Sequence, residues 1–116
     1  MKFKMIMALT SDDKTNAVCK AARDLGATGS TVITSARGEG LTPAKTFLGL
    51  SLEGQVDVCI FLVEEHLSRL ILEGIAEAGE FDSKTGTGIA VQIDIEDAVG
   101  LKHQIGAIEE EIEDKL

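Results

Sequence analysis

Residues 56–79 read VDVCIFLVEEHLSRLILEGIAEAG, and this stretch decides the fold. Its first eight residues, 56–63, are rich in apolar and β-branched side chains, which predicts a strand with apolar character on both faces. From Leu67 to Ala78 the apolar residues recur at helical spacing, and Gly79 ends this stripe. The stretch therefore predicts a strand followed directly by an amphipathic helix.

A strand and a helix of the same kind come earlier in the chain. Residues 2–9 alternate between apolar and other side chains, which predicts the first strand. Ser11 is a suitable N-cap for the helix that follows, and Gly26 is suited to end that helix. Residues 30–35 are rich in β-branched side chains and predict the second strand.

The last third of the chain adds one more strand and a tail. Residues 84–88 (KTGTG) predict a tight loop, and alternation across residues 89–95 predicts the fourth strand. We expect a short extra strand near residues 99–102. The tail carries apolar residues at helical spacing opposite a run of glutamates, so it predicts an amphipathic acidic helix. These features divide the chain into a domain of residues 1–103 and a C-terminal helix of residues 104–116.

The order of the main elements, β-α-β-β-α-β, predicts an α+β fold of the ferredoxin-like, split β-α-β type. In this fold the sheet is antiparallel and both helices cover the same face. We expect the other face to carry Ile6, Phe61 and Val63. Because an apolar face of this kind must be hidden from water, we predict that the chain assembles as a homotrimer.

Composition excludes several classes of function. The 116 residues fit one domain, and 20 acidic residues against 11 basic ones give a net charge of −9. A nucleic-acid site needs a basic surface, and Tyr and Trp, on which bases stack, are absent. No apolar run has the length of a membrane-spanning helix, and the first residues lack the apolar region of a signal peptide. We therefore expect a cytoplasmic protein that neither binds nucleic acid nor inserts into a membrane.

No set of residues in the sequence has the pattern of a catalytic centre. Neither His66 nor His103 lies beside a serine or cysteine in a nucleophile motif. Cys19 and Cys59 fall inside a predicted helix and a predicted strand, where small apolar residues of the core are expected. No paired-cysteine or histidine–glutamate motif indicates a metal site. We therefore predict that the chain is not an enzyme and that it has no metal site.

Two glycine runs are candidates for binding an anion. Residues 37–40 (RGEG) follow the second predicted strand, and residues 85–88 (TGTG) precede the fourth. Glycines allow backbone N–H groups to approach an anion, and successive amides can surround it. Neither run is a P-loop or a dinucleotide-binding fingerprint, and each alone is more typical of ordinary turn chemistry.

Several motifs together resemble one protein family. GATGSTV at 26–32, RGEG at 37–40, a long loop, the strand at 56–63 and KTGTGIAV at 84–91 occur in this order. Over about residues 1–102 this pattern resembles the PII signal-transduction proteins of the nitrogen regulatory protein P-II superfamily, in their divergent PII-like branch. The resemblance implies a homotrimer of ferredoxin-like subunits that binds nucleotides in clefts between neighbouring subunits. It also implies a role in signal transduction, such as the regulation of nitrogen utilisation.

The resemblance also implies roles for individual residues. Thr31 would lie near the adenine, residues 86–88 would form the loop on the phosphate side, and Lys102 of the adjoining subunit would face phosphate. Residues 37–55 would form the T-loop, which engages a protein partner such as a membrane transporter. The implied effector-binding residues are Thr31, Arg37, Gly38, Gly40, Gly86, Thr87, Gly88 and Lys102. The candidate partner-binding residues of this loop are Thr42, Phe47, Leu48, Leu50 and Leu52. The apolar ones among them suit a partner-binding surface or packing between subunits, or else a fold back onto the sheet. We expect residues 41–54 to be mobile in the absence of a partner, because they combine glycines with a proline in a long connection.

Departures from the family pattern narrow the range of nucleotides that we expect the chain to bind. Ile89 and Gly100 stand where the family has a lysine and an arginine, Thr42 replaces a glutamine, and Cys59 replaces a glutamate. Each change removes a charge or a donor that would hold a triphosphate or its metal ion. We therefore expect no tightly bound cofactor, and AMP or ADP as effector in preference to ATP. The absence of tyrosine excludes uridylylation of the T-loop.

Two other functions remain open on the sequence. The first is a trimer of the divalent-cation tolerance type, which has a ferredoxin-like fold and binds metal ions. The lack of a histidine and cysteine cluster argues against it. The second is a small enzyme on a ferredoxin-like scaffold, which the missing catalytic set disfavours. Fold alone does not choose among the three.

Overall fold

A computed structural model describes residues 1–36, 46–47, 50–51, 55–102, 105–106, 109 and 113. Strands and helices alternate in the order that the sequence predicts, with one additional pair of very short strands. The elements are β1 (Phe3–Ser11), α1 (Thr15–Asp24), β2 (Thr31–Ala36), β3 (Thr46–Phe47), β4 (Leu50–Ser51), β5 (Val56–Glu64), α2 (Glu65–Gly79) and β6 (Gly88–Asp94).

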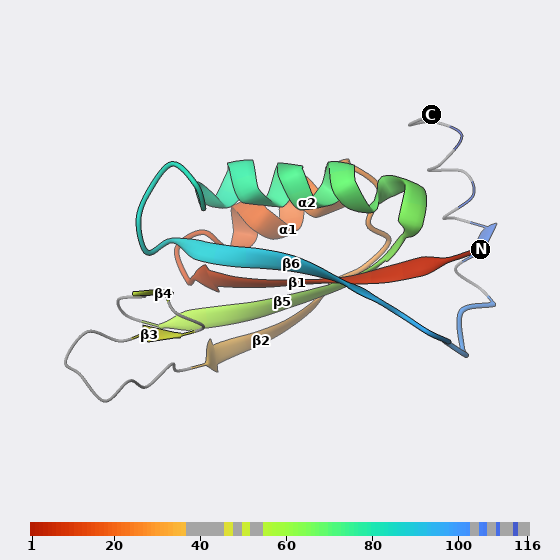
Figure 1. The fold of residues 1–116 in the computed structure, drawn as a ribbon, viewed down its shortest axis with the longest axis horizontal. Helices are drawn as coiled ribbons and strands as arrows, with labels where there is room; N and C mark the ends of the chain where they lie inside the picture. The colour runs from red at the N-terminus through yellow and green to blue at the C-terminus, as the bar shows by residue number, and fades with distance from the viewer. Residues whose placement is uncertain are drawn as a thin grey trace.

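The main sheet has four strands in the order β2-β5-β1-β6, and every neighbouring pair is antiparallel. Both helices lie on the same side of this sheet, in one layer (Figure 1). The predicted α+β class, with an antiparallel sheet and two helices on one face, is therefore confirmed. The two edge strands are β2 and β6, which lie farthest apart in the sheet.

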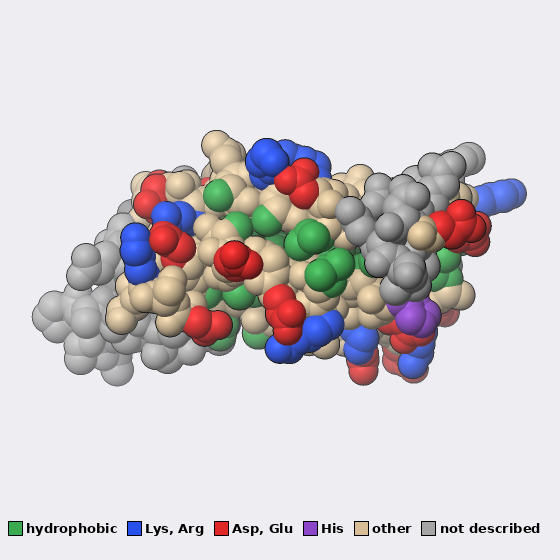
Figure 2. Space-filling model, turned by 90° about the horizontal axis from the view of Figure 1, so that it is seen from above, with side chains coloured by type: hydrophobic (Ala, Val, Ile, Leu, Met, Phe, Trp, Pro, Cys, Tyr) green, Lys and Arg blue, Asp and Glu red, His purple; other side chains and the backbone are tan. Residues whose placement is uncertain are grey.

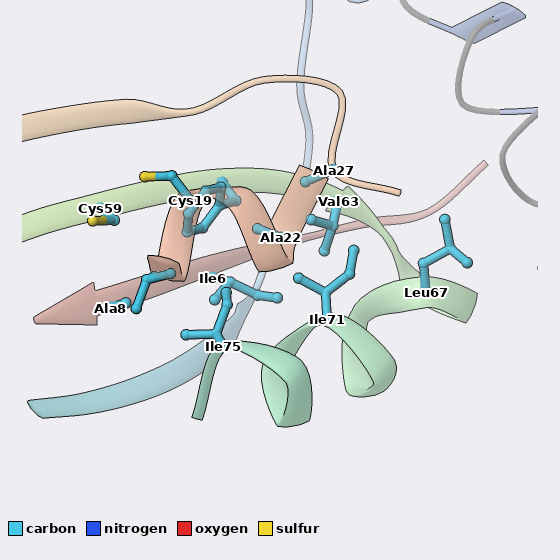
Figure 3. Close-up of a cluster of buried hydrophobic side chains, with 12 residues drawn as sticks. Ile6, Ala8, Cys19, Ala22, Ala27, Cys59, Val63, Leu67, Ile71 and Ile75 are labelled. Atoms are coloured by element: carbon cyan, nitrogen blue, oxygen red, sulfur yellow. The ribbon is translucent and has the colours of Figure 1, made fainter. Parts of the chain in front are cut away.

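The core lies between the sheet and the two helices. Ile6 on β1 is paired with Phe61 on β5, and neither side chain has exposed surface. Cys59 and Val63 lie on the same face of β5 as Phe61, and Ile71 and Ile75 of α2 pack on them (Figure 3). Burial of these apolar side chains is the main force that fixes the helices on this face.

The sequence analysis placed Ile6, Phe61 and Val63 on the uncovered face, and this assignment was wrong. All three are buried beneath the helices, with exposed fractions of 0%, 0% and 2%. The error arose because β5 is apolar on both faces, so its alternation does not reveal which face the helices cover. The uncovered face is formed by the alternate residues of each strand.

This uncovered side of the sheet, which we call the open face, is also apolar. Cross-strand pairing places Ile33, Val58, Leu9 and Ile89 in one row across all four strands. Half of the surface of Ile33 and 40% of that of Ile93 are exposed. The open face consists of Met5, Met7, Leu9, Ile33, Val58, Ile60, Leu62, Ile89, Val91 and Ile93.

The two helices begin and end at identifiable residues. Ser11 is not the N-cap that the sequence predicted, because it is the last residue of β1 and α1 starts only at Thr15. Gly26 follows the end of α1, as predicted, and its N–H donates to the carbonyl of Arg23. At the start of α2, the Glu64 carboxylate accepts a hydrogen bond from the N–H of His66. Within the residues that the structure describes, no helix has the length and apolar character needed to cross a membrane.

Two parts of the chain differ from expectation. Residues 37–55 were predicted as one loop, yet β3 and β4 pair within them as a two-stranded sheet. The prediction of a short strand near residues 99–102 is wrong, because residues 95–102 form no strand. β6 leaves its partner β1 at Asp94, so these residues have no ladder to continue. Of the predicted 104–116 tail, Ile105, Gly106, Glu109 and Glu113 are described, and they are helical.

Candidate functional site

The predicted effector-binding residues lie on opposite edges of the sheet. Thr31 begins β2 at one edge, and Gly88 begins β6 at the other. β5 and β1 lie between them, so the two edges are about 14 Å apart at the usual strand spacing. One chain therefore does not bring Thr31 and the 86–88 loop together. It presents two separate half-sites.

The first half-site is the turn of residues 80–88, between α2 and β6. Its ends are fixed by hydrogen bonds: the Ser11 N–H donates to the Thr87 carbonyl over 2.9 Å, and the Thr87 hydroxyl donates to the Glu80 carbonyl over 2.8 Å. Among the described residues, no backbone carbonyl accepts a hydrogen bond from the N–H of Thr85 or Gly86. The turn is thus anchored at both ends and leaves two amide donors free at its tip, which suits an anion.

Glycine is required at positions 86 and 88 of this turn for two different physical reasons. Gly86 has a φ of 78°, a left-handed conformation that side chains other than glycine rarely adopt. At Gly88 the constraint is space, because a Cβ atom there would lie 2.3 Å from the Leu9 carbonyl oxygen. Gly88 is therefore explained by the close approach of β1. Gly86 is the glycine whose conformation shapes the tip of the turn.

A carboxylate that the sequence analysis did not single out lies at the base of the same turn. Oε2 of Glu80 is 2.6 Å from Nζ of Lys14 and 3.3 Å from Nζ of Lys84. The close contact with Lys14 is the main reason that the pKa of Glu80 is lowered, and Lys84 adds to it. The same contact raises the pKa of Lys14. On the helix side of the molecule, basic and acidic side chains accordingly lie together near the end of α2 (Figure 2).

The second half-site is a shallow hollow of about 370 Å³ at the β2 edge of the open face. Thr31 lines it together with Ile60, Leu62 and Leu101. Lys102 follows Leu101 directly and is exposed. The hollow thus offers an apolar floor together with Thr31, and Lys102 is the next residue in the chain after one of its lining residues.

The remaining predicted site residues lie on the segment between β2 and β5. Phe47 in β3 pairs with Leu50 in β4. We also expected residues 41–54 to be mobile. Apart from the two short strands β3 and β4, this segment lies outside the described residues. The predicted residues outside the described part of the chain are Arg37, Gly38, Gly40, Thr42, Leu48 and Leu52.

Among the described residues, one group of side chains has the donor atoms and spacing to hold a metal ion. Glu64, Glu65 and His66 each offer one ligand atom, and these atoms lie within 4.8 Å of one another. Glu64 already accepts from the backbone N–H of His66 over 2.7 Å, and its other oxygen lies 2.6 Å from the His66 ring. The contact with Glu64 raises the pKa of His66. This arrangement is that of a capped helix start with an ion pair.

The cysteines are not placed for nucleophilic chemistry. Cys19 on α1 and Cys59 on β5 are both buried in the core, as the sequence analysis predicted (Figure 3). Burial is the main reason that the pKa of Cys59 is raised to about 12, and the neighbouring Cys19 adds to it. Because the thiolate is the reactive form, Cys59 remains an unreactive thiol at neutral pH.

A buried carboxylate at the start of β5 was also missed by the sequence analysis. The Thr15 hydroxyl donates to Oδ2 of Asp57 over 2.6 Å, and both residues are buried. This bond ties the start of α1 to the sheet, close to the end of the sheet that carries the 80–88 turn. Its signal in the sequence was a charged residue within an otherwise apolar strand.

The chain is similar to known proteins in sequence and in fold. The family model of nitrogen regulatory protein P-II matches residues 3–104. No curated protein matches the sequence. Among solved structures, a PII-like signalling protein from Thermus thermophilus is 23% identical, with a TM-score of 0.61, over 82% of this chain and 87% of that one.

Two structures of a second protein, from Thiomonas intermedia, are also similar. CPII bound to ADP, AMP and acetate is 19% identical, with a TM-score of 0.61, over 81% of this chain and 86% of that one. The apo form of CPII, described as a nitrogen regulatory PII-like protein, is 18% identical, with a TM-score of 0.60, over 82% and 90%. These likenesses concern the fold.

Proposed function

The chain belongs to the nitrogen regulatory protein P-II family, and from this premise we propose that it is a regulatory protein that binds a small anionic effector between subunits. In this proposal three copies form a ring, and each effector site combines the 80–88 turn of one copy with the Thr31 hollow of the next. Binding then changes how the protein engages a partner. The chain itself catalyses no reaction.

One observation carries this proposal: the two half-sites lie at opposite edges of one sheet. A second copy that brings its β2 edge to the β6 edge of the first would place Thr31 and Gly86 in one cleft. Head-to-tail contacts of this kind generate a closed ring when the rotation between neighbouring copies closes. The same arrangement would give Lys102 of one copy access to an anion held at the turn of the other.

The open face supports the trimer on independent grounds. Apolar residues occupy it on all four strands, with Ile33 and Ile93 well exposed, and exposed apolar patches mark interaction sites in soluble proteins. Three sheets that turn their open faces toward a common axis would remove this surface from water. The charged residues of the helix side would then remain outside.

The proposed effector is AMP or ADP. Turn amides at Thr85 and Gly86 suit a phosphate group, and the hollow beside Thr31 has the apolar floor that a base requires. CPII, whose fold is similar, was solved with ADP and AMP bound. The position after Gly88 is Ile89 rather than a cation, so a third phosphate would find few donors.

For the partner, the proposal assigns the 37–55 segment, which includes β3 and β4. The residues proposed to make this contact are Thr42, Phe47, Leu48, Leu50 and Leu52. A membrane transporter is one class of partner that a regulator of this kind would control.

Sedimentation at micromolar protein concentration tests the assembly. A mass near three times 12.3 kDa is expected, and a monomer would contradict both the trimer and the shared site. A thermal-shift panel of AMP, ADP, ATP, bicarbonate, 2-oxoglutarate and divalent metal ions tests the effector. Stabilisation by metal ions alone would favour the cation-tolerance alternative.

A further inference from the structure

Glu80 occupies a position that is unfavourable for a glutamate in two ways. Its backbone is left-handed, with a φ of 57°, and it is the only non-glycine residue with positive φ among those that the structure describes. Glycine is the usual residue where a helix ends in this conformation. In addition, a carboxylate at a helix C-terminus faces the negative end of the helix dipole.

What offsets these costs is the pair of lysines around the carboxylate. Oε2 of Glu80 has almost no exposed surface and lies between the ammonium groups of Lys14 and Lys84. Lys84 begins the KTGTG run, and Lys14 follows the end of β1 that is hydrogen-bonded to Thr87. Both cations therefore lie beside the turn, and they share one internal anion, which offsets one of their two positive charges.

We propose that Glu80 is a built-in counter-anion of the 80–88 turn, which competes with the phosphate groups of ligands for Lys14 and Lys84. This inference rests on the proposed function for its physiological meaning, because it concerns the same half-site. In this proposal Lys14 and Lys84 supply the positive charge that Ile89, the residue after Gly88, does not.

The geometry allows this competition. The Lys84 side chain is 62% exposed, and its distance to the Glu80 carboxylate is longer than that of Lys14. It can therefore turn toward an anion in solution without disturbing the core. The backbone carbonyl of Glu80 accepts the bonds from the Lys84 N–H and the Thr87 hydroxyl. Neutralising the side chain therefore leaves the backbone bonds of the turn intact. Removal of the carboxylate frees two cations beside the free amides of Thr85 and Gly86.

Glu80→Gln tests the proposal, with Glu77→Gln as the matched control. Both changes raise the net charge by one, and Glu77 is an exposed residue one helical turn earlier on α2. Calorimetry with inorganic pyrophosphate and with ADP would measure affinity at low and moderate salt. We expect Glu80→Gln to bind pyrophosphate roughly tenfold more tightly than wild type, as for one recovered charge-assisted contact. Glu77→Gln should stay within about twofold of wild type.

Two further variants make the outcome decisive. Glu80→Gly suits the left-handed backbone and should show the same gain, so the result does not depend on how glutamine fits. Adding Lys14→Met to Glu80→Gln should return the affinity for pyrophosphate to near the wild-type value. If Glu80→Gln and Glu80→Gly bind pyrophosphate no more tightly than Glu77→Gln, the carboxylate does not compete and the proposal is overturned.

The failure of this inference is distinguishable from failure of the proposed function. Pyrophosphate needs no adenine site, so it tests the lysines and the turn alone. If no variant binds ADP but Glu80→Gln gains pyrophosphate affinity, the nucleotide proposal fails and the counter-anion stands. If wild type binds ADP and Glu80→Gln weakens that binding, Glu80 is a clamp that positions the turn, and the counter-anion is excluded.

Discussion

Ile6 on β1 and Phe61 on β5 are direct cross-strand neighbours, and neither side chain has any exposed surface. The pair lies beneath both helices and fixes which face of the sheet is the core. Its counterpart on the other face is the pair Met7 and Ile60, one residue along each strand. One sheet therefore has two apolar faces. The helices cover the first, and on the second only a small cluster around Leu9 and Val56 is buried within the chain.

Phe61→Ala should destabilise the fold strongly. Truncation of a fully buried phenylalanine leaves a cavity and typically costs about 3–5 kcal/mol. Urea unfolding at fixed protein concentration measures the loss. Leu70→Ala is the control, since Leu70 lies on α2 with 42% of its surface exposed and should cost less than about 1 kcal/mol. Equal losses in the two variants would contradict the assignment of the core.

Gly88→Ala should destabilise through a backbone clash. The new Cβ would meet the Leu9 carbonyl oxygen at 2.3 Å, and a backbone atom inside a sheet cannot move aside cheaply. We expect a cost of about 1–3 kcal/mol. Gly29→Ala is the matched control, because no atom lies within 4 Å of its added Cβ. If thermal unfolding shows both variants to be equally stable, the close approach of β1 to Gly88 is refuted.

The pair formed by Glu64 and His66 should make stability depend on pH. Because Glu64 raises the pKa of His66 above 6.5, the folded state favours the protonated ring. The stabilisation is therefore complete below pH 6.5 and is lost as the pH rises through the higher folded-state pKa. The free-energy difference between wild type and His66→Gln, measured by urea unfolding from about pH 5 to 9, should shrink as pH rises. A difference that is constant or grows with pH would refute the pairing.

Ligand preference follows from the charges around the half-sites. AMP or ADP should bind more tightly than ATP, with or without magnesium, because Ile89 and Gly100 offer no cation to a third phosphate. Lys102→Ala should weaken binding by roughly tenfold or more, the effect of one charge-assisted contact. Lys20→Ala is the control, because Lys20 is paired with Asp24 on the exposed side of α1. Tight binding of magnesium-ATP by calorimetry would contradict the preference.

Much of the fold could be predicted from local patterns. The helical stripe from Leu67 to Ile75 and the alternation along β1 and β6 each follow from a single period in the sequence. The face of β5 that the helices cover could not be predicted, since Phe61 and Ile60 are both apolar. Only the pairing with Ile6, which is a long-range contact, decides between them.

The candidate site was predicted in part. Gly86 and Thr31 were identified by their place in a motif, and the structure puts each at an exposed edge of the sheet. Glu80 was missed because its meaning depends on Lys14, which lies far away in the sequence and reaches it only through the fold. The left-handed backbone at Glu80 could not be predicted either, because glycine, not glutamate, is the residue that usually adopts this conformation at the end of a helix.

The central claim is that each effector site is completed by two copies of the chain. Mixing two defective variants tests it most directly. Lys102→Ala impairs the half-site at the β2 edge, and Gly86→Val impairs the turn beside β6, where φ is 78°. Each variant alone should bind ADP poorly. The two are unfolded together, refolded as a mixture and titrated with ADP, after mass measurement has shown that mixed assemblies form.

A site shared between copies predicts recovery in this mixture. By random assembly about one quarter of the interfaces join the intact β2 edge of a Gly86→Val subunit to the intact turn of a Lys102→Ala subunit. We therefore expect ADP to bind with wild-type affinity at about one quarter of the wild-type stoichiometry. If mixed assemblies form and no high-affinity ADP binding returns, the site does not lie between copies, and the account is contradicted.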